Sequence, residues 1–117
     1  MSIYLKRAYE KAEESDAYRV LVDRLWPRGV AKESLKIDQW MKDIAPSDDL
    51  RRWFGHDPHK WDEFKERYFG ELEENRDLLE ELKRKVREGS ITLVYAAKDE
   101  QYNNAVALKE YLERISA

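Results

Sequence analysis

Two short stretches of the chain are almost continuously apolar, which is the pattern of a β-strand covered on both faces. One is the Val-Leu-Val centre, at 20–22, of a segment from 18 to 25, and the other is Ile-Thr-Leu-Val-Tyr-Ala-Ala at 91–97. A third segment, 3–8, alternates weakly and carries β-forming residues. These patterns predict three strands, of which those at 18–25 and 91–97 are buried on both faces.

Helical spacing dominates much of the remaining chain. Ser47 has the character of an N-cap residue, with Asp48 and Asp49 at the positive end of a short helix that runs to Gly55. From about 59 to 88, apolar residues recur at steps of three, four and seven, which predicts one long amphipathic helix that would break near Gly70 or Asn75. A final helix is predicted from the apolar spacing between 102 and 115.

Residues 35–44 fit two patterns. Their apolar positions have helical spacing, whereas the length of the segment and the Pro46 that follows it also suit a strand. The prediction favours a strand at 37–43, with a helix as the alternative. Because strands and helices interleave, we expect an α/β fold with a small, mostly parallel sheet and helices on both faces, as a single domain over residues 1–117.

The composition narrows the functional classes. Acidic residues outnumber basic ones by 25 to 22, for a net charge of −3, and the basic residues are spread along the chain, which argues against nucleic-acid binding. The absence of cysteine excludes disulfides, thiolate metal sites and cysteine nucleophiles. No signal peptide and no apolar run of about 20 residues is found. We therefore expect a cytoplasmic protein without membrane contact, either a monomer or a weak homodimer.

Two polar clusters follow the predicted strands, where ligands of α/β proteins usually bind. The first contains Asp23, Arg24, Trp26 and Arg28, with two guanidinium groups suited to a phosphate or carboxylate and an aromatic ring for stacking. A structural interpretation of this cluster pairs Arg24 with Asp23 or with another carboxylate.

The second cluster follows the strand at 91–97. It contains Lys98 and Asp99, with Asn103 and Asn104 one turn later. In the structural interpretation, Asp99 caps the last helix and the two asparagines are solvated.

The first hypothesis is therefore that the protein binds a small anionic ligand, such as a phosphate-bearing metabolite or a nucleotide, with Asp23 or Asp99 as the available base if it is an enzyme. The candidate ligand-binding residues are Asp23, Arg24, Trp26, Arg28, Ser47, Arg51, Lys98, Asp99 and Asn103. The alternative is a protein-interaction module in which exposed aromatic residues bind a partner and the arginines form structural ion pairs.

No metal or cofactor is expected. His56 and His59 could in principle ligate a metal, but no clear third ligand accompanies them. The four tryptophans are interpreted as core or interface residues rather than as a platform for stacking bases. The chain has no phosphate-binding loop, no dinucleotide fingerprint and no nucleophile elbow.

Three segments of the chain are distinctive: Arg-Val-Leu-Val-Asp-Arg-Leu-Trp-Pro-Arg-Gly at 19–29, Ile-Ala-Pro-Ser at 44–47 with Leu-Arg at 50–51, and Thr-Leu-Val-Tyr-Ala-Ala-Lys at 92–98. Together they resemble the YeaO-like family of short prokaryotic proteins of unknown function. The resemblance implies an α/β fold, favours a strand at 37–43 and supplies no catalytic residues. Longer relatives in the broader superfamily place Cys or His near the start of the last helix, where this chain has Asn103 and Asn104.

Overall fold

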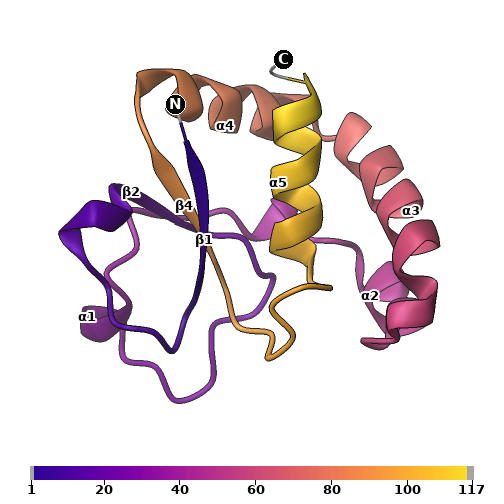
Figure 1. The fold of residues 1–117 in the computed structure, drawn as a ribbon, viewed down its shortest axis with the longest axis horizontal. Helices are drawn as coiled ribbons and strands as arrows, with labels where there is room; N and C mark the ends of the chain where they lie inside the picture. Colours follow the sequence, from indigo (N-terminus) through magenta and orange to yellow (C-terminus); the bar gives the residue numbers. More distant parts are fainter. Residues whose placement is uncertain (1, 116–117) are drawn as a thin grey trace.

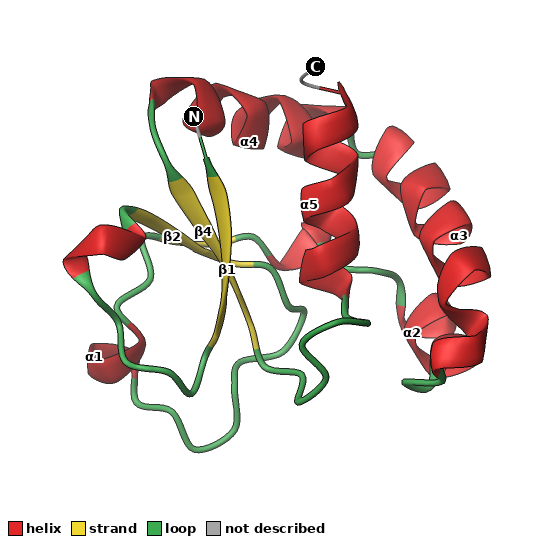
Figure 2. Ribbon diagram, in the orientation of Figure 1, coloured by secondary structure: helices red, strands yellow, loops and turns green. Residues whose placement is uncertain are grey.

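The computed structural model describes residues 2–115, and its centre is a four-stranded, all-parallel sheet (Figures 1 and 2). The strands are β1 (Ile3–Arg7), β2 (Tyr18–Leu21), β3 (Gln39–Trp40) and β4 (Ile91–Tyr95), in the order β1-β4-β2-β3. Since every strand runs in the same direction, all their carboxyl ends lie at one edge of the sheet. The predicted α/β class with a small parallel sheet is confirmed.

In the part of the chain that the structure describes, five helices accompany the sheet: α1 (Lys32–Leu35), α2 (Asp48–Phe54), α3 (Trp61–Glu73), α4 (Arg76–Glu88) and α5 (Asn104–Ile115). Short 3₁₀ turns lie at Glu14–Asp16, Lys42–Ile44 and Pro58–Lys60. Helices α2–α5 contribute to the main hydrophobic core on one face, whereas α1 and the loop before it cover the other face (Figure 1). Within residues 2–115, no helix combines the length and apolar character needed to cross a membrane.

Side chains along the two central strands point alternately to the two faces of the sheet, and both faces are covered, which explains the continuous apolar sequence of these strands. Val20 and Leu93, which are register partners, belong to the main core beneath the helices. Their neighbours Leu21 and Val94 are also partners and belong to the smaller core on the opposite face. All four are completely buried. The prediction that these two strands are covered on both faces is confirmed, although both end sooner than expected, at Leu21 and Tyr95.

The strand predicted at 37–43 is mostly wrong, because only Gln39 and Trp40 pair with β2. The chain then turns through Lys42–Ile44, and this turn brings Met41 and Ile44 into the main core. Burying these two side chains under the helices is incompatible with continuing along the sheet edge. Helix α1 was not predicted at all.

The long helix predicted for 59–88 is two helices, and the break lies at Asn75 rather than at Gly70. The Asn75 side chain donates a hydrogen bond of 3.3 Å to the carbonyl of Asp43, on the segment that precedes α2. Gly70 lies within α3 and does not interrupt it. The change of direction allows α3 and α4 to cover different parts of the same core.

Candidate functional site

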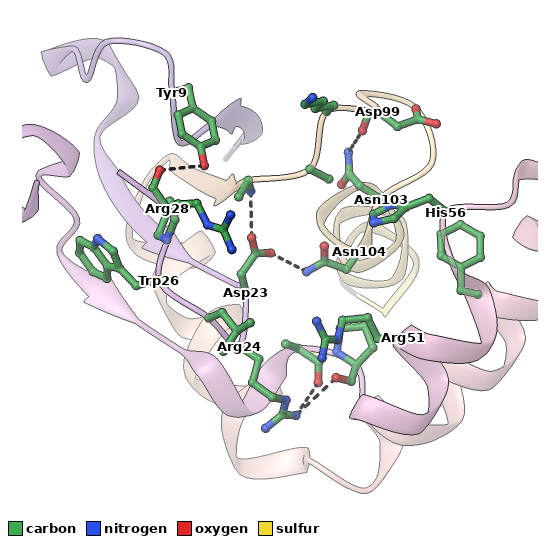
Figure 3. Close-up of a pocket in the computed structure, with 18 of the residues that line it drawn as sticks. Tyr9, Asp23, Arg24, Trp26, Arg28, Arg51, His56, Asp99, Asn103 and Asn104 are labelled. Atoms are coloured by element: carbon green, nitrogen blue, oxygen red, sulfur yellow. Dashed lines mark hydrogen bonds between the residues drawn. The ribbon is translucent and has the colours of Figure 1, made fainter. Parts of the chain in front are cut away.

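A pocket of about 590 Å³ opens at the carboxyl edge of the sheet (Figure 3). The loops that follow β2 and β4 form two of its walls, and the Ala45-Pro46 segment together with α2 forms a third. The sequence-predicted site residues that line it are Asp23, Arg24, Trp26, Arg28, Arg51, Lys98, Asp99 and Asn103. The structure therefore brings together all of the candidates except Ser47.

Asp23 connects the two strand-end loops across the pocket. Its Oδ2 accepts a hydrogen bond of 2.8 Å from the backbone N–H of Ala96, and its Oδ1 accepts one of 3.1 Å from Asn104 Nδ2. The same Asn104 nitrogen donates to the carbonyl of Val22, at 3.1 Å. Burial raises the pKa of Asp23, and the hydrogen bonds from Ala96 and Asn104 offset part of that effect. Asp23 is thus held in a fixed orientation by a donor on each oxygen.

Arg24 makes several contacts within the protein, although its buried Nε has no hydrogen-bond partner among residues 2–115. Its Nη2 donates to the carbonyls of Ala45 and Pro46, at 3.3 and 3.4 Å (Figure 3). Asp43 and Asp48 lie 3.7 and 4.0 Å from its guanidinium nitrogens. These contacts match the structural interpretation of Arg24 as an internal partner, and they fix the loop that forms the third wall of the pocket.

Arg28 and Lys98 supply the unengaged cations of the pocket. Both side chains are exposed, and Arg28 extends toward Asp23 in Figure 3. Within the described part of the chain, neither side chain forms a hydrogen bond or an ion pair; the backbone carbonyl of Arg28 accepts one from Tyr9 Oη, at 3.2 Å. Arg51 differs from them, because it pairs with Asp48 at 3.2 Å.

Asp99 and Asn103 order the loop that leads into α5. Asp99 Oδ1 accepts hydrogen bonds from the backbone N–H groups of Gln101 and Tyr102, at 2.9 and 3.0 Å, and these bonds lower the pKa of Asp99. Asn103 Oδ1 accepts from the N–H of Val106 at 2.9 Å, so Asn103 is the N-cap of α5. Asp99 therefore caps the turn before the helix and not the helix itself, and Asn103, at 2% exposed, is not solvated as the structural interpretation had it.

Ser47 lies outside this pocket. It is the predicted N-cap of α2, since its Oγ accepts a hydrogen bond of 3.2 Å from the N–H of Leu50. Its own N–H and Oγ donate to the Glu71 carboxylate of α3, at 2.8 and 2.6 Å. The prediction of the cap is confirmed, and these contacts account for all the hydrogen-bonding groups that had made Ser47 a ligand-binding candidate.

Sequence reasoning missed Tyr9 and His56 as pocket residues. Tyr9 follows β1, which pairs with β4, so knowledge of the strand order would have placed it at the same edge. His56 follows Gly55, and both have positive φ angles, of 57° and 53°, which turn the chain toward the pocket at the end of α2. Among residues 2–115, no three side chains of the His, Asp or Glu types converge as metal ligands, so His56 and His59 are not part of such a group.

Comparison with known proteins gives a consistent family. A family model described as "Inactive DUF488-N3 subclade" matches residues 2–117. "Uncharacterized protein YeaO" of Escherichia coli K12 is 40% identical over 115 residues, covering 98% of this chain and 100% of that protein. "Uncharacterized protein Rv3073c" of Mycobacterium tuberculosis H37Rv is 37% identical over 110 residues, covering 94% and 92%. No solved structure matches. The YeaO-like resemblance is thus confirmed, and the chain belongs to the family described as the inactive DUF488-N3 subclade.

Proposed function

We propose that this protein binds a small anionic ligand, a phosphate-bearing metabolite or a nucleotide, in the pocket at the carboxyl edge of the sheet. One observation carries the proposal: Arg28 and Lys98 line the same pocket, and neither is paired with a carboxylate in residues 2–115. They come from the loops after β2 and β4, which are adjacent strands about 4.8 Å apart. Two cations facing one space repel each other, and a bound anion would relieve that repulsion.

The remainder of the pocket supports a ligand larger than a single ion. Apolar groups form much of its lining: Leu25, Trp26, Pro27, Ala45, Pro46, Phe54, Phe64, Ala96 and Ala97. The volume of about 590 Å³ lies within the range of about 300 to 1,000 Å³ that is usual for small-molecule sites. A ligand with its anionic group on the two cations could place a less polar part against this wall.

The site is better suited to binding than to turnover. Of the two candidate bases, Asp99 already accepts two backbone hydrogen bonds, and these keep its pKa low. Asp23 is held by two donors, the backbone N–H of Ala96 and Nδ2 of Asn104. The family's description as an inactive subclade also supports binding without catalysis.

The alternative, an interaction module with exposed aromatic residues, has less support. Trp26 and Trp40 pack edge to face with ring centroids 5.4 Å apart, and Trp61 stacks on Phe64. Trp53 is covered by the cations of Lys60 and Arg67. The large apolar residues that are exposed in the described chain are Tyr4, Tyr9 and Leu25, and the last two of these line the pocket.

To test the proposal, the protein is titrated with inorganic phosphate, glucose 6-phosphate and adenosine 5′-monophosphate. Binding of each compound is measured by thermal shift and by calorimetry. A bound ligand raises the melting temperature by mass action. Arg28→Ala is expected to weaken binding by roughly 10- to 100-fold, because it removes a charge-assisted hydrogen bond, and to leave the melting temperature of the free protein nearly unchanged.

Arg87→Ala is the matched control. Arg87 is exposed near the end of α4, which leads into the start of β4 and so lies at the opposite edge of the sheet. This variant should bind like the parent. No thermal shift with any of the three compounds, or an equal loss of affinity in both variants, would contradict the proposal.

A further inference from the structure

Judged by the described residues, the pocket contains an unpaired carboxylate as well as unpaired cations. Asp23 faces the space into which Arg28 extends (Figure 3). Within residues 2–115, no ion pair joins Asp23 to Arg28 or to any other basic side chain. A partly buried carboxylate without a cation is unfavourable in the free protein, and the raised pKa of Asp23, caused by burial, reflects this. A ligand that supplies a positive or hydrogen-bonding group would remove the penalty.

Asp23 retains acceptor capacity for such a group. A carboxylate has about four lone-pair sites, and Ala96 and Asn104 each occupy one site, on different oxygens. The carboxylate is also held rigidly, since one donor is backbone and the other is anchored on the carbonyl of Val22. A preorganised acceptor of this kind recognises a donor with little loss of conformational entropy.

We propose that the ligand carries an amino group in addition to its anionic group, and that Asp23 is the specificity-determining residue that accepts a hydrogen bond from it. This inference rests on the proposed function, with the anionic group at Arg28 and Lys98. An amine-bearing phosphate satisfies both kinds of charge in the pocket. A phosphate without the donor leaves Asp23 unpaired beside a second anion, and the site discriminates against it.

Two matched pairs of probes test this with the intact chain. 2-Aminoethyl phosphate is compared with ethyl phosphate, and adenosine 5′-monophosphate is compared with purine riboside 5′-monophosphate, which lacks only the amino group. The amine-bearing member of at least one pair should bind roughly 10- to 100-fold more tightly, as expected for a charge-assisted hydrogen bond. The pair that shows the preference identifies the donor as an aliphatic amine or as an amino group on a heterocycle.

Asp23→Asn should abolish that preference and leave the affinity for the amine-free member equal or tighter. The matched control is Asp77→Asn, at an exposed aspartate in the first turn of α4, and it should keep the preference. If a folded Asp23→Asn variant keeps it, the role of Asp23 is overturned.

The parent protein decides the proposal even if Asp23→Asn fails to fold, because the preference within each pair is measured without any substitution. Binding of the phosphates with no preference in either pair overturns this inference and leaves the proposed function standing. Binding of none of the four probes overturns the proposed function, and this inference with it.

Discussion

Arg19 and Asp16 form a buried ion pair on the face of the sheet that α1 covers. Arg19 is 3% exposed and Asp16 is 8% exposed, and Arg19 Nη1 donates to Asp16 Oδ2 at 2.6 Å. The other guanidinium nitrogens of Arg19 donate to the carbonyl of Leu35, the last residue of α1. Lys6 Nζ and the N–H of Glu13 also donate to Asp16. The ion pair therefore holds both the short helix, through Arg19, and the β1–β2 connection, through Asp16, against the sheet.

Asp16→Asn tests how much this ion pair contributes to the stability of the protein. The substitution keeps the shape and removes the charge, so at neutral pH it should lower the free energy of unfolding by about 3 to 5 kcal/mol, the usual cost of stranding a buried partner. Burial tends to raise the pKa of Asp16, but hydrogen bonds from Glu13, Lys6 and Arg19 outweigh burial and lower it. A carboxylate with a lowered pKa contributes stability above its unfolded pKa of about 3.9, and the contribution is lost as the pH falls through the folded value.

The difference in free energy of unfolding between the parent and Asp16→Asn should therefore have its full value at pH 7 and should shrink as the pH falls below about 4. Urea unfolding at a series of pH values measures it. Asp49→Asn serves as the control, because this aspartate side chain is 99% exposed and its removal should change little at any pH. A difference in unfolding free energy that stays constant down to the lowest pH would show that the loss does not come from the charge of Asp16.

At the scale of the elements, the junction between α2 and α3 depends on Ser47. Its hydroxyl caps α2 through Leu50 and its two donors bind Glu71, so a single residue fixes the start of one helix on the side of the next. Ser47→Ala should lower the free energy of unfolding by about 1 to 2 kcal/mol, through the lost cap and the lost donor to Glu71.

Chemical denaturation measures this loss, and Ser34→Ala, at an exposed position in α1, should change stability by less than about 0.5 kcal/mol. Because Ser47 lies outside the pocket, Ser47→Ala should also leave the affinity for phosphate compounds unchanged. A loss of affinity with intact stability would return Ser47 to the ligand-binding residues.

The elements that sequence patterns predicted correctly are those fixed by local chemistry. The cap at Ser47 and the buried strand β4 each have a signal within a few residues. For the segment at 59–88 the pattern predicted one long helix and left the break open between Gly70 and Asn75, and the contact of Asn75 with Asp43 comes from a part of the chain 32 residues away. The segment at 37–43 has no such signal, since its path depends on Met41 and Ile44 packing under helices that are distant in sequence. A pattern of apolar spacing alone cannot indicate which partner buries these side chains.

At the scale of the whole molecule, the strand order decides which residues meet. The rule that ligands bind at the carboxyl edge correctly placed the loops after β2 and β4 together, including Arg28 and Lys98. Tyr9 was missed because the pairing of β1 with β4 joins segments from opposite ends of the chain, and the sequence carries no local sign of that pairing. The carbonyl groups of Ala45 and Pro46 that bind Arg24 could not be predicted from the sequence either, because they lie on the loop before α2, about 20 residues further along the chain.

The distribution of charge over the whole molecule also determines what it will not bind. The chain has a net charge of −3, and most basic side chains that contact a carboxylate do so on the same helix, as in the pair of Arg67 with Glu63. The unengaged cations of the pocket lie beside Asp23 and Asp99. Non-specific binding to DNA requires several phosphates to be neutralised by adjacent Lys and Arg residues, and each such contact adds to the salt dependence.

We therefore expect binding to a random DNA duplex no tighter than about 10⁻⁴ M at physiological salt, even if the pocket accepts a single nucleotide. A duplex phosphate is flanked by further phosphates that the surrounding carboxylates repel, whereas a free nucleotide presents one anionic group to Arg28 and Lys98. Fluorescence anisotropy with a labelled duplex, compared with calorimetry on the mononucleotide, separates the two. Micromolar duplex binding that weakens steeply with added salt would contradict this expectation and would show that basic residues outside the pocket form a face for nucleic acid.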